Sequence, residues 1–260
     1  MTEQIEYIEL AKEAARQAGA FIASHPPTNI RHKGAIDFVS SIDEGSEELL
    51  RDFFATHTPN IDIYAEEMGG AKDSPDRWII DPLDGTTNFL HGFPAFCVSI
   101  ALQLNNTLRV GVIYNPITQE MFYAHRGAGA FCNGHSIFCS HANSLNTALL
   151  ATGFPYDRRE RADEYLVYFK QFLVKSRGIR RMGSAALDLA NVACGRIDGF
   201  WEFGLQAWDV AAGALLIEEA GGYCTEMNGE ALQLHQPTVL AGGELVWTEM
   251  KTIFNLSGIL

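Results

Sequence analysis

Several features that mark common classes of protein are missing from this 260-residue sequence. Its opening segment, MTEQIEYIEL, contains glutamates but no lysine or arginine, so it lacks the basic flank of a secretory signal and the arginine-rich character of a transit peptide. No apolar run approaches the roughly 18 residues that a membrane span requires. We therefore expect a cytoplasmic protein with no membrane partner.

Positive charge is also scarce. The chain has 19 lysine and arginine residues against 32 aspartate and glutamate residues, which gives a net charge of −13. Nucleic-acid surfaces concentrate positive charge against phosphate, so nucleic acid is not expected as the main partner. An anionic substrate would be repelled by the overall field, and a local site would have to reverse the sign.

Recognisable cysteine and histidine motifs are absent. The five cysteines are odd in number and show no Cys-x-x-Cys spacing, which favours buried free thiols over disulfides or a zinc cluster. The eight histidines show no His-x-His or His-x-x-x-His spacing and are interpreted as surface or core residues. Metal ligands, if any, should therefore be sought among the carboxylates.

What is present is ample material for a core, because 47% of the residues are hydrophobic and 20% are charged. Apolar periodicity predicts an α+β part over residues 1–142 and an α/β part over residues 143–260, with an antiparallel meander in the first part. Helices are predicted over 3–23, 44–57, 160–175, 184–194, 208–220 and 244–256, and strands over 38–42, 61–64, 77–80, 96–104, 108–114, 120–124, 148–152, 197–203 and 223–226.

The stretch WIIDPLDGTTNF, residues 78–89, carries two acids where a buried strand ends. Asp81 lies at the carboxyl end of the strand, where open sheets place their ligands. Pro82 biases the chain into a turn that brings Asp84 beside Asp81 and leaves the Leu83 carbonyl free. Two carboxylates and a carbonyl in one turn suit Mg²⁺.

The next residues suit a phosphate. Gly85 lets the backbone approach a ligand closely, and Gly85-Thr86-Thr87 would expose amides at the start of a helical turn. The alternative is a solvated turn, since aspartate, proline and glycine are common in turns. Two further acidic clusters, Glu66-Glu67 at a strand end and Trp208-Asp209 at a helix start, favour a functional site over three unrelated turns.

Together with WDVAAGALLIEEAGG, residues 208–222, this stretch resembles the paired signatures of the inositol monophosphatase family of Mg²⁺-dependent, lithium-sensitive phosphatases. The similarity covers essentially the whole chain and includes Ala65-Glu66-Glu67, residues 40–43 and the run GSAALDLANVACGRIDGFWE from Gly183 to Glu202. The resemblance implies a layered α-β-α-β-α sandwich, a homodimer, and a metal and phosphate site in residues 1–142 that residues 143–260 complete.

The resemblance also assigns roles to individual residues. Two or three Mg²⁺ ions would be held, and Glu67 would lie behind the ligands without binding metal itself. Thr86, with Glu66, would orient and help to deprotonate the attacking water, and Asp43 would complete that relay by a hydrogen bond to Thr86. The implied metal ligands are Glu66, Asp81, the Leu83 carbonyl, Asp84 and Asp209. The implied substrate contacts are Asp84, Gly85, Thr86, Gly183, Ser184, Ala185, Glu202 and Asp209, of which Ala185 and Glu202 correspond to positions that contact polyol hydroxyls.

The implied reaction is hydrolysis of a small polyol phosphate, foremost myo-inositol monophosphate, by in-line attack of a metal-activated water with no phosphoenzyme. Paired divalent ions would also reverse the sign of the local field. A haloacid-dehalogenase phosphatase is a rival, but its acids are two positions apart and Glu66 and Asp209 would have no role. Fructose bisphosphate, histidinol phosphate and phosphoadenosine phosphate remain alternative substrates, and a regulatory binding role remains an alternative function.

Two segments depart from the family pattern. In the 29–37 loop, Lys33 stands one position from where relatives carry a mobile-loop lysine, with His32 at the aligned place, so its role stays open. Gln206-Ala207 replace a common proline before Trp208. The mixed-charge run at 158–161 is interpreted as a solvated helix start, with a phosphate clamp or a partner contact left open. Asp188 is interpreted as structural.

Overall fold

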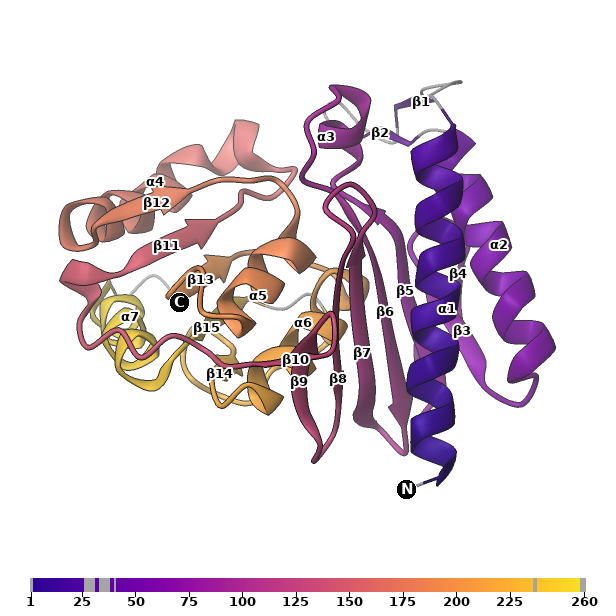
Figure 1. Cartoon of the computed structure of the whole chain (residues 1–260). Coiled ribbons are helices and arrows are strands. Elements are labelled where there is room, and N and C mark those ends of the chain that lie inside the picture. The colour runs from indigo at the N-terminus through magenta and orange to yellow at the C-terminus, as the bar shows by residue number, and fades with distance from the viewer. Residues whose placement is uncertain (1, 26–30, 33–37, 40, 236–237, 258–260) are drawn as a thin grey trace.

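The computed structural model describes residues 2–25, 31–32, 38–39, 41–235 and 238–257. Within them the chain forms alternating layers, a helix pair on each outer side and a third helix pair between an eight-stranded and a five-stranded sheet (Figure 1). The predicted layered α-β-α-β-α order is confirmed. From one outer layer to the other, the helices are α1 (Thr2–Ser24) and α2 (Ser41–His57), then α5 (Ala185–Ala193) and α6 (Ala207–Glu219), then α4 (Arg158–Lys175) and α7 (Glu244–Ser257).

The eight-stranded sheet is formed by β3 (Asp62–Ala65), β4 (Gly69–Gly70), β5 (Arg77–Asp84), β6 (Cys97–Leu104), β7 (Thr107–Asn115), β8 (Glu120–His125), β9 (Gly129–Cys132) and β10 (His135–Ile137). Its order is β10-β9-β8-β7-β6-β5-β3-β4. The run from β5 to β10 is antiparallel throughout, which confirms the predicted meander, and β3 is parallel to β5. A short helix, α3 (Thr86–Leu90), follows β5 directly.

The five-stranded sheet is formed by β11 (Leu149–Thr152), β12 (Gly178–Arg180), β13 (Gly199–Glu202), β14 (Tyr223–Thr225) and β15 (Val239–Gly242). Its order is β12-β11-β13-β15-β14, with β11 parallel to both neighbours and β15 antiparallel to both of its own. β12 and β15 were not predicted, because each is a short run whose pairing is decided by strands distant in the sequence. The 3₁₀ turn η1 (Leu145–Thr147) precedes β11.

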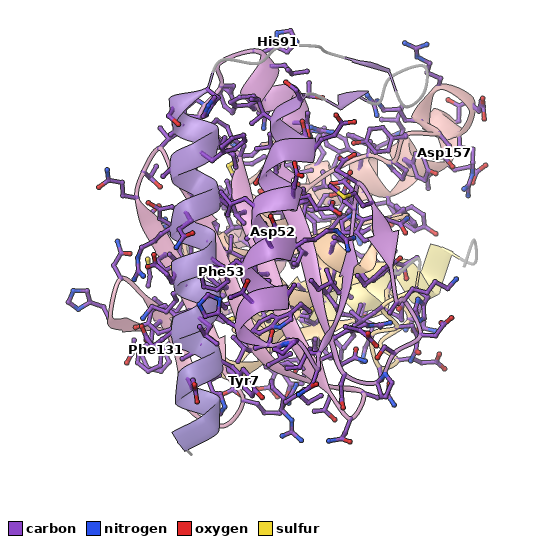
Figure 2. The ribbon with its side chains drawn as sticks, turned by 90° about the vertical axis from the view of Figure 1, so that its right-hand side faces the viewer. Tyr7, Asp52, Phe53, His91, Phe131 and Asp157 are labelled. Carbon is purple, nitrogen blue, oxygen red and sulfur yellow. The ribbon has the colours of Figure 1, made fainter. Side chains whose placement is uncertain are left out.

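The helix layers match their apolar patterns. α1 and α2 lie side by side over one face of the first sheet, where Tyr7 and Phe53 pack against the core that these helices share with the sheet (Figure 2). α6 contacts both sheets, and its residues from Val210 to Ile217 are all buried. A helix that is apolar on every side belongs between layers in this way.

Some predicted boundaries are wrong. The strand predicted over 38–42 is only β2 (Phe38–Val39), which pairs with β1 (Arg31–His32), and α2 already begins at Ser41, so Asp43 lies inside its first turn and does not precede it. The strand predicted to end at Ile80 continues to Asp84. Lys33 and the other residues of the 29–37 loop, apart from β1, lie outside the described residues. The division of the chain at residues 142 and 143 stays a prediction.

The described helices include none that is both long and apolar enough to cross a membrane.

Candidate active site

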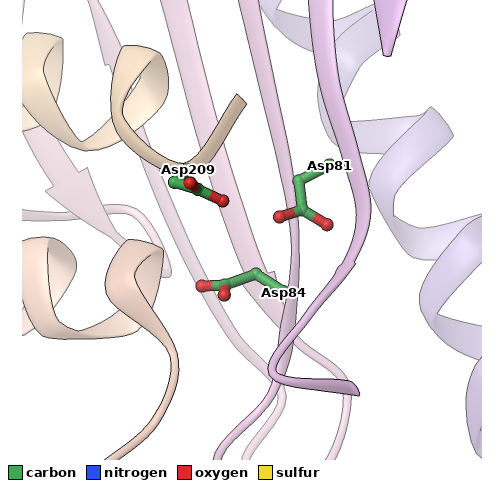
Figure 3. Close-up of side chains that lie close together, drawn as sticks. All are labelled: Asp81, Asp84 and Asp209. Carbon is green, nitrogen blue, oxygen red and sulfur yellow. The ribbon is translucent and has the colours of Figure 1, made fainter. Parts of the chain in front are cut away.

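Three carboxylates from two distant parts of the chain meet between the sheets. One oxygen from each of Asp81, Asp84 and Asp209 lies within 4.8 Å of the others. Figure 3 shows Asp81 and Asp84 on the same segment and Asp209 facing them from the first turn of α6. The sequence analysis expected these three side chains to share one site, and the structure brings them together.

β5 sets the positions of the first two acids. Its pairing with β6 shifts register between Asp81 and Asp84, so the strand bulges around Pro82. The Leu83 amide donates to Asp81 Oδ1 at 3.0 Å, and Ser46 Oγ of α2 donates to the Pro82 carbonyl at 3.1 Å. These contacts fix the bulge of β5 at the place where the sequence analysis predicted a turn.

Backbone and hydroxyl donors from the second half of the chain fix the other carboxylates. Asp84 Oδ2 accepts hydrogen bonds from Ser184 Oγ at 2.6 Å and from the Ala186 amide at 2.7 Å, both at the start of α5. Asp209 Oδ2 accepts one from the Gln206 amide at 2.6 Å. These hydrogen bonds all involve Oδ2, so the Oδ1 atom of each aspartate remains available to bind a metal ion.

The cluster is electrostatically unfavourable without a cation. Burial raises the pKa of Asp81 well above its usual range, and the negative charges of Glu66, Asp84 and Asp209 raise it further. Burial also raises the pKa of Asp209 well above its usual range. Burial raises the pKa of Asp84 as well, although the hydrogen bonds that Asp84 accepts oppose the rise. Carboxylate and carbonyl oxygens without sulfur are a donor set that suits Mg²⁺, so the residues present fit that ion.

Glu66 directly follows β3, and the segment after it is held by Glu47, a residue that the sequence analysis missed. The Glu66 amide donates to the Ile80 carbonyl at 3.2 Å. The next two amides, of Glu67 and Met68, donate to the carboxylate of Glu47 at 2.7 and 3.0 Å, and Arg51 pairs with Glu47 at 2.8 Å. Glu47 is fully buried on the apolar face of α2. An acidic residue at an apolar position of the helical pattern was therefore the sequence signal that could have identified it.

Thr86 connects the metal turn to α2. Its hydroxyl lies 2.8 Å from Asp43 Oδ1 and 3.1 Å from the Leu83 carbonyl, and its single proton can serve only one acceptor at a time. The predicted hydrogen bond between Asp43 and Thr86 is thus present. The preceding Gly85 has φ of +94°, and a Cβ there would lie 2.8 Å from the Ala95 carbonyl oxygen, so the turn requires glycine.

A cavity of about 580 Å³ opens over these residues. Asp43 and Glu67 do not line it, which agrees with the supporting positions expected of them. All the predicted metal and substrate residues line it. Arg158, from the run for which a phosphate clamp was left open, lines it too, and so does Arg181, which the sequence analysis did not single out. The cavity is lined by Glu66, Asp81, Leu83, Asp84, Gly85, Thr86, Thr87, Gly153, Phe154, Pro155, Tyr156, Arg158, Arg181, Gly183, Ser184, Ala185, Asp188, Glu202, Phe203, Gly204, Leu205, Gln206, Trp208 and Asp209.

The cavity is also lined by Glu202, a carboxyl outside the cluster of three aspartates. Its carboxylate lies over Gly153, where a Cβ would come within 2.1 Å of Glu202 Oε1. Burial raises the pKa of Glu202 to about 8, against the opposing effect of the Arg181 charge. The Arg181 guanidinium in turn lies over Gly183. Gly153 and Gly183 therefore leave room for the Glu202 and Arg181 side chains at the cavity.

The raised pKa of Glu202 predicts how the metal-free protein responds to pH. Because the folded-state value of about 8 exceeds the ordinary value near 4.3, the unfolded chain loses its proton first, and the folded state loses stability as pH rises between those values. The substitution Glu202→Gln removes this loss. The free energy of unfolding of the variant, relative to that of the unaltered protein, should increase by about 2 to 4 kcal/mol between about pH 5 and pH 8.5. Urea denaturation in the presence of a chelator measures this difference.

The exposed Glu160 at the start of α4 offers a matched control, because Glu160→Gln should leave the pH dependence unchanged. A Glu202→Gln effect of the same size at both pH values would contradict the prediction.

Comparison with known proteins agrees with this geometry. A sequence model of the inositol monophosphatase family matches residues 3–255. The chain belongs to the inositol monophosphatase family. An inositol-1-monophosphatase of Mesorhizobium japonicum is 41% identical over 241 residues, 92% of this chain and 91% of that protein. A Nus factor SuhB of Pseudomonas aeruginosa is 43% identical over 259 residues, 94% of each chain.

Solved structures of inositol monophosphatase relatives share the fold. The extragenic suppressor protein suhB of Bartonella henselae superposes with a TM-score of 0.92 at 38% identity, covering 98% of this chain and 100% of that one. The inositol monophosphatase of an Anabaena species gives 0.89 at 40% identity, covering 96% of each chain. The family resemblance and the fold class inferred from the sequence are both confirmed.

Proposed function

We propose that this inositol monophosphatase family member hydrolyses small polyol phosphate monoesters with the help of Mg²⁺, foremost myo-inositol monophosphate. Family membership supports phosphatase activity in general. The observation that carries the finer proposal is the convergence of Asp81, Asp84 and Asp209 in a cavity that Glu202 also lines. The three aspartates suit a metal and phosphate, and Glu202 suits hydroxyl groups.

Glu66, Asp81, Asp84, Asp209 and the Leu83 carbonyl would hold two or three Mg²⁺ ions. When bound, Mg²⁺ supplies positive charge that stabilises phosphate oxygens and increases the acidity of water. It also relieves the mutual repulsion that raises the pKa of the buried aspartates. An acidic protein of net charge −13 could then attract a phosphate dianion into the cavity.

Thr86 would act on the attacking water. When its hydroxyl donates to Asp43, at 2.8 Å, its lone pairs can accept a proton from a water that Glu66 also orients. The Asp43 carboxylate, which accepts this hydrogen bond, would complete the relay. The backbone amides of Gly85 and Thr86, which line the cavity, would bind the phosphate oxygens.

The leaving group would occupy the part of the cavity beside Glu202. Gly183, Ser184 and Ala185 also line the cavity, and Glu202 would accept hydrogen bonds from the hydroxyl groups. A haloacid-dehalogenase type of reaction fits less well, because Asp81 is almost fully buried and already accepts the Leu83 amide. A cytoplasmic homodimer inhibited by lithium is expected from the family resemblance.

A binding or regulatory role is the second candidate function. It is raised by the name of the Pseudomonas aeruginosa relative, a Nus factor. The acid cluster of Asp81, Asp84 and Asp209 and its supporting hydrogen bonds favour catalysis, because a purely structural protein gains nothing from buried like charges.

The proposal is tested by Mg²⁺-dependent phosphate release over a panel of inositol phosphates, fructose bisphosphate, histidinol phosphate and phosphoadenosine phosphate, each with and without lithium. We expect the highest kcat/KM with an inositol monophosphate and inhibition by lithium. Absence of phosphate release from every compound at saturating Mg²⁺ would favour the regulatory role.

A further inference from the structure

Two arginines line the cavity of the acid cluster, and they are the only lysine or arginine residues among the described residues around it. Arg158 is the first residue of α4 and is partly exposed, whereas Arg181 directly follows β12 and is exposed. The other charged residues that line the cavity are all acidic. In a chain of net charge −13, two cations at this place call for an explanation.

The position of the Arg181 side chain is defined by its contacts with neighbouring residues. A Cβ on Gly183, itself a cavity residue, would lie 2.6 Å from Arg181 Nη1 and 3.0 Å from Asn88 Nδ2. Asn88 Nδ2 also donates to the Met182 carbonyl at 2.8 Å, which ties the backbone beside Arg181 to α3. Because α3 begins at Thr86, the Arg181 guanidinium lies close to the helix that follows the proposed phosphate site.

Arg158 is held at the cavity by Pro155. Its backbone amide and its Nη1 both donate to the Pro155 carbonyl, at 3.2 and 3.3 Å. Pro155 also lines the cavity and lies against Gly204, where a Cβ would come within 3.4 Å of the proline ring. One end of the guanidinium is therefore fixed, and its other N–H groups remain available to a ligand.

Neither guanidinium is paired with a carboxylate. Within the part of the chain that the structure describes, Arg158 and Arg181 form no ion pair, although acidic side chains line the same cavity. The arginines that do pair with an acid do not line this cavity, namely Arg16, Arg51, Arg126, Arg161 and Arg196. An unpaired guanidinium keeps its planar set of donors, which matches the oxygens of a phosphate.

Each of these two arginines has an arginine next to it in the sequence that does not line the cavity. Arg159 is exposed on α4, and Arg180 is exposed at the end of β12, where its Nη1 donates to the Ile179 carbonyl at 3.2 Å. The fold therefore separates each Arg-Arg pair into one residue at the cavity and one outside it. The phosphate clamp left open for the run at 158–161 concerns Arg158.

We propose that Arg158 and Arg181 capture the phosphate dianion of the substrate as it enters the cavity. The inference rests on the proposed phosphatase function and deepens it, because it assigns substrate capture to residues other than the metal ligands. An acidic protein repels a dianion at long range, and cations that line a concave site reverse that effect locally. The two arginines therefore favour binding of any phosphate monoester, whatever alcohol leaves.

The test replaces each arginine by glutamine and measures hydrolysis of myo-inositol monophosphate at saturating Mg²⁺. At low ionic strength, Arg158→Gln and Arg181→Gln should each lower kcat/KM about 3- to 10-fold, and the double variant about 10- to 100-fold, the range of electrostatic steering. The loss should appear in KM, with kcat changed less than about twofold, because the charges act before the ester reacts. The loss should shrink severalfold in about 0.5 M salt, which screens exposed charges.

Matched controls separate capture from a general effect of net charge. Arg159→Gln and Arg180→Gln change the net charge equally, and kcat/KM should stay within about twofold of that of the unaltered protein because these exposed charges are screened. Arg181→Lys keeps the charge and should recover most of the loss. Para-nitrophenyl phosphate should lose as much as myo-inositol monophosphate, because the phosphate is the group that both share.

Equal losses in the control variants, a loss confined to kcat, or a loss that salt does not reduce would overturn the inference while leaving the proposed function standing. A loss on the inositol substrate alone would assign the arginines to the leaving group and would also overturn it. Thermal unfolding shows whether each variant is folded, and if Arg158→Gln is not, the exposed Arg181 decides the outcome. If the unaltered protein releases phosphate from no compound, the proposed function itself fails, and the inference fails with it.

Discussion

Asp84→Asn should abolish most of the phosphate release from myo-inositol monophosphate while the fold survives. Asp84 belongs to the acid cluster, and its charge is the part that asparagine lacks. The asparagine oxygen can still accept the Ser184 hydroxyl and the Ala186 amide, so the start of α5 keeps its contacts. We expect kcat at saturating Mg²⁺ to fall by about 10³-fold or more, the upper range for loss of one preorganised electrostatic group.

The thermal midpoint of this variant should not fall, because removal of a buried like charge favours the metal-free folded state. Asp62→Asn, on an exposed position at the start of β3, is the matched control and should keep full activity. Near-normal turnover by Asp84→Asn at saturating Mg²⁺ would refute the proposed site.

Thr86→Ala should slow turnover by about 10²-fold or more, the usual contribution of a positioned acid–base group. Its hydroxyl contacts Asp43 and the Leu83 carbonyl, and it is not among the proposed metal ligands. Calorimetry should therefore show a Mg²⁺ affinity within a few fold of that of the unaltered protein. The loss should appear in kcat more than in KM, because the hydroxyl is proposed to act on the water and not on the ester.

Thr86→Ser separates the hydroxyl from the methyl group and should retain most of the activity. Thr56→Ala, at an exposed position of α2, controls for the loss of a threonine elsewhere. A Thr86→Ala variant with unchanged kcat would remove Thr86 from the proposed relay, and a large loss of Mg²⁺ binding would make it a support of the metal turn.

Much of the layered fold could be predicted from local pattern. The strands of the meander are long and bounded by asparagine turns, and α6 is apolar along its length, so both were found from sequence alone. β12 and β15 were missed because they are short and are stabilised by neighbours from distant segments. The start of α2 was misplaced because β2 leads into it after a single residue.

The candidate site also contains some residues that local sequence predicts and others that it does not. The turn from Asp81 to Gly85 could be interpreted from its own residues, since proline and glycine restrict the backbone there. That Asp209 faces it depended on family resemblance, because no local rule brings together residues so far apart. Glu47 and Asp188 were not placed in the site because their significance lies in their burial, which a linear pattern does not record. Arg181 was not placed there because only the folded chain brings it to the cavity.

The position of Asp209 at the start of the central helix α6 has a consequence for synthesis of the protein. Asp81 and Asp84 leave the ribosome more than a hundred residues before Asp209, and Ser184 and Ala186, which orient Asp84, also follow late. A partly synthesised chain therefore contains Asp81 and Asp84 but not Asp209, the third member of the cluster. If this cluster holds Mg²⁺, as proposed, the ion would bind the finished arrangement more tightly. Cellular Mg²⁺ would then selectively stabilise chains whose second half has docked, and would contribute to quality control of folding as well as to chemistry.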